Sequence, residues 1–398
     1  MINFFRIGLV QNILYLLIIT IEMISLNKKS VVLFIILTTY VLLFMSCKRN
    51  YNYLNGEIIT VNIPEKTDTL YGKTITLDGV YTGKIFAYDS LIIFMSKNTP
   101  IYQMSVYSLS SMKQIGSFCQ YGNGPNESRF FTHYNQYKED DTGLHLWMNM
   151  NNYLKLSCIN ISQSIIEQRS IFDSTKIDIV WRNHFDVPFL RTFVLNNDTC
   201  IVKNQSMDKF SKSIDYIPGA YHLYSIKTKE IIKTYTLFNK PIINKRTGNK
   251  RPLPKEEYLG STDAIKPDRS KIAMLMWHMG QFNILNIETG EITGYRLSET
   301  PDFNSLIYVN PYDFVDYFDL ISVDDDYIYA SYCGQKNTPN PVPYNRILIF
   351  NWDGNFINSF YTDNIVSHMT VDPVNKILYI LDIEDVLHSY NLNSLLNK

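Results

Sequence analysis

The stretch Asp268–Leu275 reads Asp-Arg-Ser-Lys-Ile-Ala-Met-Leu, and Phe282–Ile287 follows it as Phe-Asn-Ile-Leu-Asn-Ile. An acidic turn residue stands before a first apolar run, and a short gap separates that run from a second one. Short apolar runs bounded by turn residues are typical of β-strands joined by hairpins. This stretch therefore predicts two adjacent strands of one sheet.

The same unit recurs along the chain, which indicates a repeat architecture. Its turn residue falls at Asp89, Asp141, Asp198, Asp268, Asp326 and Asn375, so successive units lie 52, 57, 70, 58 and 49 residues apart. Four-stranded propeller blades take about 40–50 residues, and loop insertions account for the longer spacings. A sandwich or a barrel has no reason to repeat six times. We therefore expect residues 57–398 to form an all-β fold, a six-bladed β-propeller of four-stranded antiparallel blades.

The last unit is one strand short, because only a handful of residues follow Leu392. Near the start of the chain, Leu70–Leu77 reads as a strand and precedes the opening strand of the first blade, Lys84–Tyr88. An unpaired sheet edge leaves backbone hydrogen-bonding groups open. We expect the N-terminal strand to supply the outer strand of the last blade and so to close the ring.

The long insertions are predicted to lie on one face of the ring. We name the strands of each blade a to d from the channel outward. The a–b and c–d turns are short, whereas the long segments make the other two connections. Four of them join d to the next a, namely Gln120–Tyr134, Phe172–Arg191, Asn239–Thr262 and Glu299–Asp316, and two join b to c, namely Gln205–Ala220 and Cys333–Asn345. Both of these connections leave a propeller on the same face. Long loops on a rigid scaffold commonly carry function, whereas drift in surface loops would lengthen both faces.

The composition indicates a β-protein with a packed core and argues against a nucleic-acid partner. Hydrophobic residues make up 45% of the 398 residues and charged residues only 19%, and 29 Tyr and 22 Phe favour strands. The formal net charge of −1 argues against nucleic acid, which calls for a clear basic excess. Cys119, Cys158, Cys200 and Cys333 show no Cys-x-x-Cys spacing, so we expect buried free thiols, with a disulfide as the open alternative.

Two apolar runs precede the repeats. The second, Val31–Met45, follows the basic segment Asn27–Ser30 and ends at Ser46 and Cys47, which supplies the three parts of a secretory signal. Its uninterrupted length is short for a transmembrane helix, which needs about 20 residues. The first run, Ile7–Leu26, has two explanations: translation starts at Met23, or the two runs form a membrane hairpin.

The stretch Leu43–Cys47 resembles a bacterial lipobox, in which the cysteine is acylated and becomes the new N-terminus after cleavage. Ser46 and Cys47 fit that motif, and Phe44 stands where Leu is usual. We expect residues 1–46 to be a signal peptide and hydrophobic leader and residues 47–56 to be a lipidated tether. An uncleaved signal anchor is the alternative. The lipid would hold the propeller in a bacterial cell envelope, on the outer membrane and facing the periplasm.

A turn motif, Gly122-Asn123-Gly124-Pro125-Asn126-Glu127, follows the outer strand of the first blade. Its Gly-x-Gly opens no helix and lacks a third glycine, so a dinucleotide site is not indicated. Gly, Pro and Asn are turn residues, and Glu127 could bond backbone amides of the loop. We interpret Gly122, Gly124, Pro125 and Glu127 as a structural loop motif.

A Gly-x-Gly-Pro-x-Glu motif after the first blade of an exported lipoprotein resembles the TolB-like six-bladed propeller lipoproteins. The motif covers residues 122–127, while blade count and layout extend the resemblance loosely over residues 57–398, and the lipobox adds to it. The resemblance implies a six-bladed propeller and carries no catalytic residue over to this chain.

Aromatic and polar residues in two segments of the long-loop face are the candidate ligand-binding residues: Trp181, Arg182, His184, Trp277 and His278. Such groups could bind a sugar or a peptide, although loop packing also explains them. The lysine- and arginine-rich segment Asn239–Glu257 could meet an acidic partner or lipid headgroups, or could simply be solvated.

The sequence carries no catalytic or metal-binding signature. The histidines lack His-x-x-x-His spacing, no Gly-x-Ser-x-Gly is present, and Asp324–Asp326 lacks the spacing of a calcium loop. We therefore expect a monomeric, non-enzymatic binding or scaffolding protein without a cofactor, whose partner is an envelope protein, a peptide or a glycan. Two alternatives stay open: a hydrolase or lyase that acts on a sugar or peptide through a channel-bound metal, and a purely structural envelope component.

Overall fold

A computed structural model describes residues 53–79, 81–96, 101–124, 126–150, 155–173, 177–178, 189–204, 221–239, 259–297, 306, 313–336 and 344–396. These residues belong to one compact unit, Tyr53–Lys398. Several predictions fall outside the described residues and stay predictions, namely those for Cys47, Pro125, Trp181, Arg182, His184 and most of the segment Asn239–Glu257.

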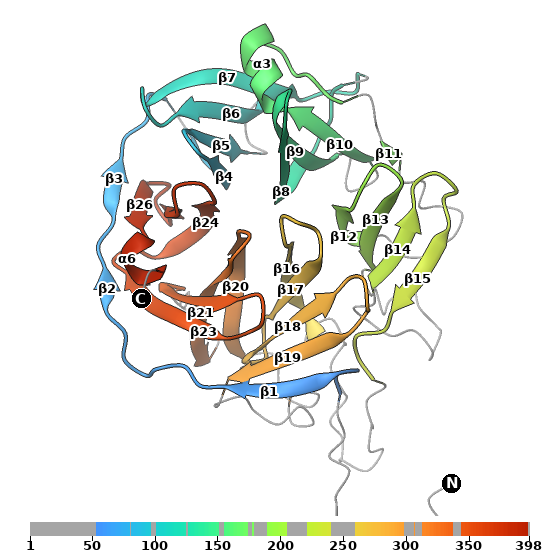
Figure 1. Ribbon diagram of the computed structural model, residues 1–398. Coiled ribbons are helices and arrows are strands. Elements are labelled where there is room, and N and C mark those ends of the chain that lie inside the picture. Colours follow the sequence, from blue (N-terminus) through green and yellow to red (C-terminus); the bar gives the residue numbers. More distant parts are fainter. Residues whose placement is uncertain are drawn as a thin grey trace, which may run out of the picture. The chain divides into compact units, whose positions relative to one another are not determined.

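The strands form six sheets around a central axis, which confirms the six-bladed propeller (Figure 1). Blade 1 consists of β4 (Lys84–Tyr88), β5 (Leu91–Met95), β6 (Tyr102–Ser108) and β7 (Lys113–Gln120). Blade 2 consists of β8 (Phe131–Asp140), β9 (Gly143–Met150), β10 (Lys155–Asn160) and β11 (Ile177–Asp178). Blade 3 consists of β12 (Phe189–Val194), β13 (Thr199–Asn204), β14 (Tyr221–Ser225) and β15 (Ile231–Tyr235). Blade 4 contains β16 (Ser261–Ile265), β17 (Lys271–Met276), β18 (Gln281–Asn286) and β19 (Ile292–Leu297). Blade 5 contains β20 (Val315–Val323), β21 (Tyr327–Lys336), β22 (Arg346–Asn351) and β23 (Phe356–Thr362). Blade 6 contains β24 (Val366–Asp372), β25 (Ile377–Asp382) and β26 (Leu387–Asn391).

The hydrophobic core lies between neighbouring blades. One cluster joins blades 4 and 5, where the rings of Phe282 and Phe350 lie 4.3 Å apart. Other clusters join blades 1 and 2, 2 and 3, 5 and 6, and 6 and 1. Because neighbouring blades cover both faces of a sheet, a strand such as β17 is buried from Ile272 to Met276 instead of alternating. This packing explains the apolar runs of the repeat.

The ring closes through the N-terminal segment, as the sequence predicts. β3 (Lys73–Ile75) pairs antiparallel with β26, with Ile75 opposite Leu387, and supplies the outer strand of blade 6. The strand is shorter than the predicted Leu70–Leu77. Ile75 and Leu77 are buried in the cluster between blades 6 and 1.

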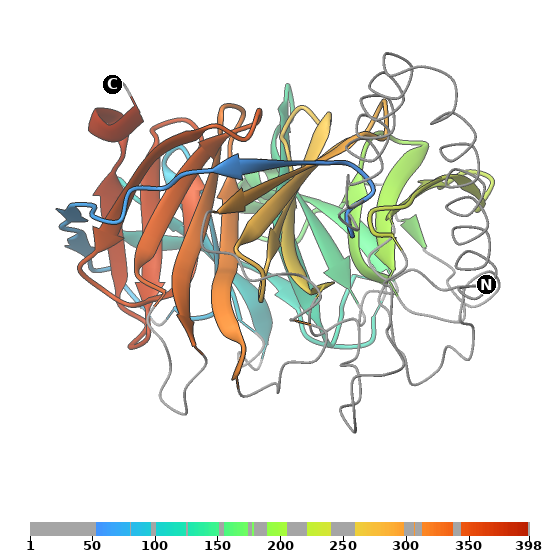
Figure 2. The same ribbon diagram turned by 90° about the horizontal axis from the view of Figure 1, so that it is seen from below.

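The N-terminal segment also wraps around two further blades, which the sequence analysis did not foresee. β1 (Glu57–Val61) pairs parallel with β19, and β2 (Thr69–Leu70) pairs parallel with β23, so blades 4 and 5 have five strands (Figures 1 and 2). We call residues 53–79 the N-terminal belt. By pairing with β19 and β23, the belt satisfies the edge groups of two outer strands. Tyr53 and Leu54, assigned to the tether by sequence, are buried at its start.

The strand bounds place the long connections mainly on one face. β13 ends at Asn204 and β14 begins at Tyr221, β15 ends at Tyr235 and β16 begins at Ser261, and β19 ends at Leu297 while β20 begins at Val315. These are b–c or d–a connections, so they leave the ring where the innermost strands begin. We call this the long-loop face.

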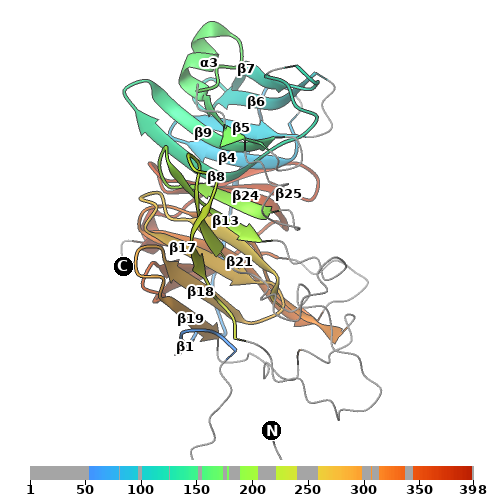
Figure 3. The same cartoon turned by 90° about the vertical axis from the view of Figure 1, so that its right-hand side faces the viewer.

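Blade 2 departs from the predicted pattern, because its c–d connection is long. It contains α3 (Ile161–Glu167), which lies beside β7 and β9 at the edge of the ring (Figures 1 and 3). Asn160 caps this helix by accepting a hydrogen bond from the Gln163 N–H, and Ile161 is buried in the core between blades 1 and 2. The chain then returns to β10, where Phe172 bridges Ile159, so Phe172 precedes strand d instead of following it.

Candidate functional site

Four of the six innermost strands are irregular where they face the channel. On β8, Tyr134, Asn135 and Gln136 stand opposite the single residue Trp147 of β9. Further register shifts lie between Phe189 and Arg191, Asp316 and Ile321, and Val366 and His368, whereas β4 and β16 pair regularly. Bulges redirect side chains and are common at the rims of barrels and beside active sites. The irregularities therefore indicate that the channel is a candidate site.

The irregular strands surround a cavity of about 120 Å³. Strands of all six blades line it: Lys84, Ile85, His133, Tyr134, Asn135, Arg191, Thr262, Asp263, Ala264, Leu320, Ile321, His368 and Met369. Lys84, His133, Arg191 and His368 stand at or near the start of their strands, so the cavity lies toward the long-loop face. A ligand that approaches from that face would therefore meet the cavity before the rest of the channel.

Two cations flank one aromatic ring in the cavity. Lys84 Nζ lies 5.0 Å and Arg191 Cζ lies 5.1 Å from the centroid of the Tyr134 ring. A cation over an aromatic face gains about 0.5–1 kcal/mol at an exposed site, and more where water is excluded. The Arg191 side chain is only 12% exposed, and its Nη1 donates a hydrogen bond of 2.7 Å to the Asp263 carbonyl oxygen. Its buried Nε makes no hydrogen bond within the described residues, but it lies 3.8 Å from Asp263 Oδ2 and forms an ion pair with that carboxylate.

Asp263, the carboxylate among the described lining residues, is already neutralised. Its Oδ2 accepts hydrogen bonds from Lys203 Nζ and from the Tyr221 hydroxyl, each at 2.7 Å. The Ser261 hydroxyl donates to Oδ1 at 2.6 Å. Burial opposes ionisation of Asp263, but Lys203 and Arg191 outweigh burial and hold the pKa of this carboxyl below its usual value. We call Lys203, Tyr221, Ser261 and Asp263 the buried ionic cluster.

The pKa values of both histidines of the cavity are lowered. Burial, together with the nearby Lys84, lowers the pKa of His133 to about 3. Burial and Lys84 also lower the pKa of His368. Asp263 pairs with both Lys203 and Arg191, so Lys84, Lys203 and Arg191 together leave a net positive charge around this one carboxylate.

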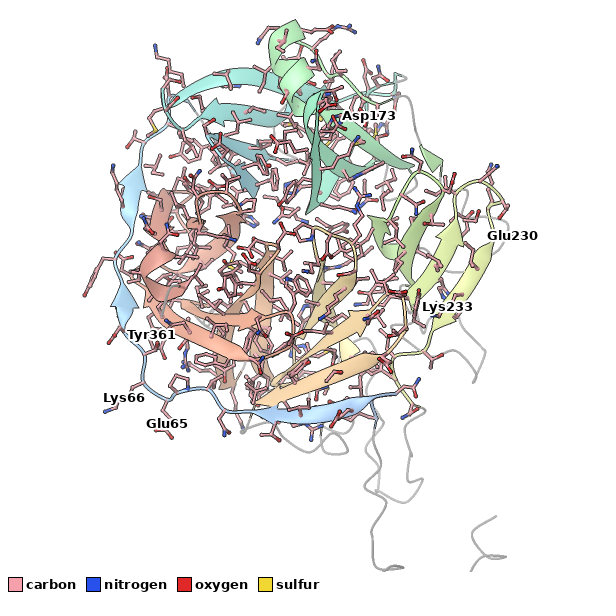
Figure 4. The ribbon with its side chains drawn as sticks, in the orientation of Figure 1. Glu65, Lys66, Asp173, Glu230, Lys233 and Tyr361 are labelled. Atoms are coloured by element: carbon pink, nitrogen blue, oxygen red, sulfur yellow. The ribbon has the colours of Figure 1, made fainter. Side chains whose placement is uncertain are left out.

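A larger hollow, of about 710 Å³, lies on the outer rim between the N-terminal belt and β23. Its lining includes Glu65 and Lys66 of the belt and Tyr361 of β23 (Figure 4). Its charged residues are Glu65, Lys66 and Asp68, which give a mixed charge, and the hollow is built by one belt segment on one blade. The channel cavity, lined by all six blades with a cationic excess, is the stronger candidate.

The structure places Trp277 beside the cavity and His278 away from its wall. Both lie in the turn between β17 and β18, and Trp277 Nε1 donates a 2.8 Å hydrogen bond to Oγ1 of Thr262, which lines the cavity. The His278 ring stacks on Phe314 with a centroid distance of 4.3 Å, and its Nδ1 lies 3.1 Å from Asp316 Oδ1. Trp277 therefore supports the channel wall, whereas His278 contacts the start of blade 5.

The described part of the glycine motif is tied together by its glutamate. Glu127 Oε2 accepts a 2.8 Å hydrogen bond from the Gly124 N–H, and the Glu127 N–H donates to the Gly124 carbonyl at 3.1 Å. A Cβ on Gly122 would collide with the Glu127 carboxylate. Gly122, Gly124 and Glu127 thus form a closed turn, away from the residues that line the channel cavity.

Sequence reasoning missed Lys84, Arg191, Lys203 and Asp263. A signal existed for two of them, because Lys203 ends the apolar run Cys200–Val202 and Asp263 precedes Ala264 and Ile265 in a strand that is buried except at Thr262. A charged residue inside a buried strand calls for a partner. No spacing rule connects Lys203 with Asp263, because they belong to different blades.

The described cysteines, Cys119, Cys158, Cys200 and Cys333, are all free, and the first three are buried. Within the described residues, no helix has both the length and the hydropathy needed to cross a membrane.

No family model matches this sequence, and no curated protein matches it either. The structure is similar to that of a member of the DUF4221 family from Bacteroides vulgatus, with a TM-score of 0.51 and 13% identity over 82% of this chain and 96% of that one. A protein named as exported in Bacteroides fragilis gives a TM-score of 0.47 and 10% identity over 84% and 98% of the two chains. Hydrazine synthase from Kuenenia stuttgartiensis gives a TM-score of 0.39 and 9% identity over 77% and 82%. At these identities the first likeness shows the propeller fold alone.

Proposed function

We propose that this chain is a lipid-anchored propeller of the bacterial cell envelope that binds its partner through the long-loop face. An anionic group of that partner enters the channel cavity. The observation that carries the proposal is the pair of cations at Tyr134, in a cavity whose described carboxylate is already neutralised by Lys203. The propeller fold is consistent with a binding or scaffolding role.

The chemistry of the cavity favours a carboxylate or a phosphate. An arginine guanidinium matches the geometry of both groups, and a lysine adds a point charge. Arg191 is held by Tyr134 and by the Asp263 carbonyl, so little side-chain freedom is lost on binding. A cavity of about 120 Å³ has room for an acidic group, and the rest of a larger ligand would contact the long loops.

The channel-bound metal of the alternative hydrolase or lyase finds no support in the described wall. Within the described residues, the side chains that come close enough to share a metal ion are His145, Cys158 and Asp173, and none of them lines the cavity. We therefore put forward a binding function for the channel.

Calorimetric titration of the full chain in detergent with succinate, inorganic phosphate and N-acetylneuraminate tests the proposal, with glucose as the neutral control. We expect at least one anion to bind and glucose to give no signal. Arg191→Ala removes a hydrogen bond to a charged group, worth about 1.5–3 kcal/mol, and should weaken binding about 10- to 100-fold. Arg169→Ala removes an exposed arginine that follows α3 and does not line the cavity, so this variant should bind the anion as wild type does. Absence of binding by all three anions, or equal binding by both variants, would contradict the proposal.

The anchor has an independent test, because fatty-acid labelling of growing cells reports acylation directly. We expect label on the wild-type chain and none on Cys47→Ala, since a thioether-linked lipid needs the Cys47 thiol. Cys333→Ala is the matched control, since Cys333 is a free and partly exposed cysteine of the propeller. Equal labelling of wild type and Cys47→Ala would show that the lipid is not on this residue.

A further inference from the structure

A second site lies in blade 2, outside the channel, where His145, Cys158 and Asp173 converge. His145 stands on β9 and Cys158 on β10, and Cys158 pairs with Trp147, two residues from His145, so the side chains of Cys158 and His145 are diagonal neighbours on one face of the sheet. Asp173 follows α3, and its N–H donates to the Cys158 carbonyl at 2.8 Å. Figure 4 shows Asp173 beside α3, at the outer part of the blade. Three neighbouring segments thus bring the three side chains together.

The ligand atoms of these residues are nearly at the spacing of a metal site. One imidazole nitrogen of His145, Cys158 Sγ and one Asp173 oxygen all lie within 4.8 Å of one another, and His145 Nδ1 is 3.2 Å from Asp173 Oδ1. Around tetrahedral zinc, bonds of about 2.0–2.3 Å hold ligand atoms about 3.3–3.8 Å apart. Small side-chain movements are therefore enough to close the site.

The imidazole of His145 is oriented as that of a metal ligand. Its Nε2 lies 2.8 Å from Thr142 Oγ1, 3.1 Å from Asp140 Oδ1 and, at a longer 3.3 Å, from Asn160 Nδ2. Since the Thr142 hydroxyl donates to Asp140, the two shorter contacts place acceptors at Nε2, so Nε2–H can donate to Thr142 and to the Asp140 carboxylate. That arrangement leaves the lone pair of Nδ1 directed toward Cys158 and Asp173. Nδ1 is buried, and no hydrogen bond of good geometry satisfies it within the described residues. A buried, unsatisfied imidazole nitrogen between a thiol and a carboxylate is the observation that points to a cation.

We infer that His145, Cys158 and Asp173 bind one zinc-like divalent ion, with water as the fourth ligand. The mixed nitrogen, sulfur and oxygen donor set suits zinc. His145 and Cys158 are buried, whereas the Asp173 side chain is 26% exposed, so the open position faces solvent. Binding releases the proton of the Cys158 thiol to solvent, since the thiolate is the ligand. Lys138 Nζ, 3.6 Å from Asp173 Oδ2, leaves Oδ1 to the metal.

The ion would stabilise the insertion that carries α3. Asp173 closes this insertion, while Cys158 and His145 belong to the body of the blade, so the metal would link the two ends of the α3 segment. The competing explanation is an imidazolium that bridges Asp140 and Asp173 without a metal. The two explanations differ in whether the chain takes up zinc.

Metal analysis of the full chain after chelation, addition of ZnSO₄ and gel filtration separates them. We expect Cys158→Ala to bind one equivalent less than wild type, and Cys200→Ala, which removes another buried free cysteine, to bind as much as wild type. Cobalt in place of zinc should give a thiolate charge-transfer band in wild type and Cys200→Ala and none in Cys158→Ala. Zinc should also raise the melting temperature of wild type and not that of Cys158→Ala.

Equal zinc content in wild type and Cys158→Ala, or no zinc in wild type, would overturn the inference, and the second result would favour the bridging imidazolium. If Cys158→Ala fails to fold by circular dichroism, Asp173→Asn replaces it, because this partly exposed side chain keeps its volume. Retention of full zinc binding by Asp173→Asn would also count against the site.

Discussion

Asp263→Asn is expected to destabilise the propeller by about 3–5 kcal/mol, because it leaves the Lys203 ammonium buried without its counter-charge. The Asp263 side chain is fully buried, and Lys203, Tyr221 and Ser261 all bond to it. The change would also loosen Tyr221, whose hydroxyl donates to the same carboxylate oxygen. Guanidinium unfolding of the variant and of wild type measures the loss as a shift in midpoint.

Asp268→Asn is the matched control, since Asp268 also pairs with a lysine, Lys266, at 2.5 Å, but its side chain is 44% exposed. Solvent screens that pair, so its loss should cost less than about 1 kcal/mol. The double variant Lys203→Met/Asp263→Asn should recover part of the stability, because it removes both buried charges. Equal midpoints for Asp263→Asn and Asp268→Asn would show that the buried ionic cluster does not carry the expected energy.

Removal of the N-terminal belt is expected to prevent folding. A chain that begins at Lys84 loses β1, β2 and β3, and with them the buried Tyr53, Leu54, Ile75 and Leu77. Each of these side chains is worth about 1.5–3 kcal/mol, and the sum, about 6–12 kcal/mol, is comparable with the whole stability of a typical domain. Circular dichroism and thermal melting should show an unfolded or strongly destabilised chain.

A chain that begins at Tyr53 is the control, because it lacks the hydrophobic leader and the tether but keeps the whole belt. We expect it to melt as the full chain does. Gly56→Val tests the belt with a smaller change, since a Cβ on Gly56 would collide with the Ile292 backbone carbonyl of blade 4. Its melting temperature should fall clearly below that of the Tyr53 form. Unchanged melting of both the Lys84 form and Gly56→Val would mean that blades 4 to 6 hold the ring without the belt.

The channel and the blade 2 cluster show why local patterns find some features and not others. Glu127 and Gly124 are three residues apart, so a turn motif in the sequence could predict their hydrogen bond. Lys84, Tyr134 and Arg191 come from three blades, and a bulge on β8 directs Tyr134 into the channel. A bulge breaks the alternation on which strand prediction rests, so it leaves no signal of its own.

The sequence by itself determined the six repeats, the closure of the ring by the strand near Leu70–Leu77 and the face that receives most of the long loops. These features depend on hydrophobic periodicity and on the number of residues between strands, both of which are local properties of the chain. Only the tertiary structure decided the parallel course of the belt along β19 and β23. It alone also decided which charges meet at Asp263 and which ligand atoms meet at His145. Those pairs are far apart in sequence or separated by an inserted helix, and only the packing of neighbouring blades and strands brings them within bonding distance.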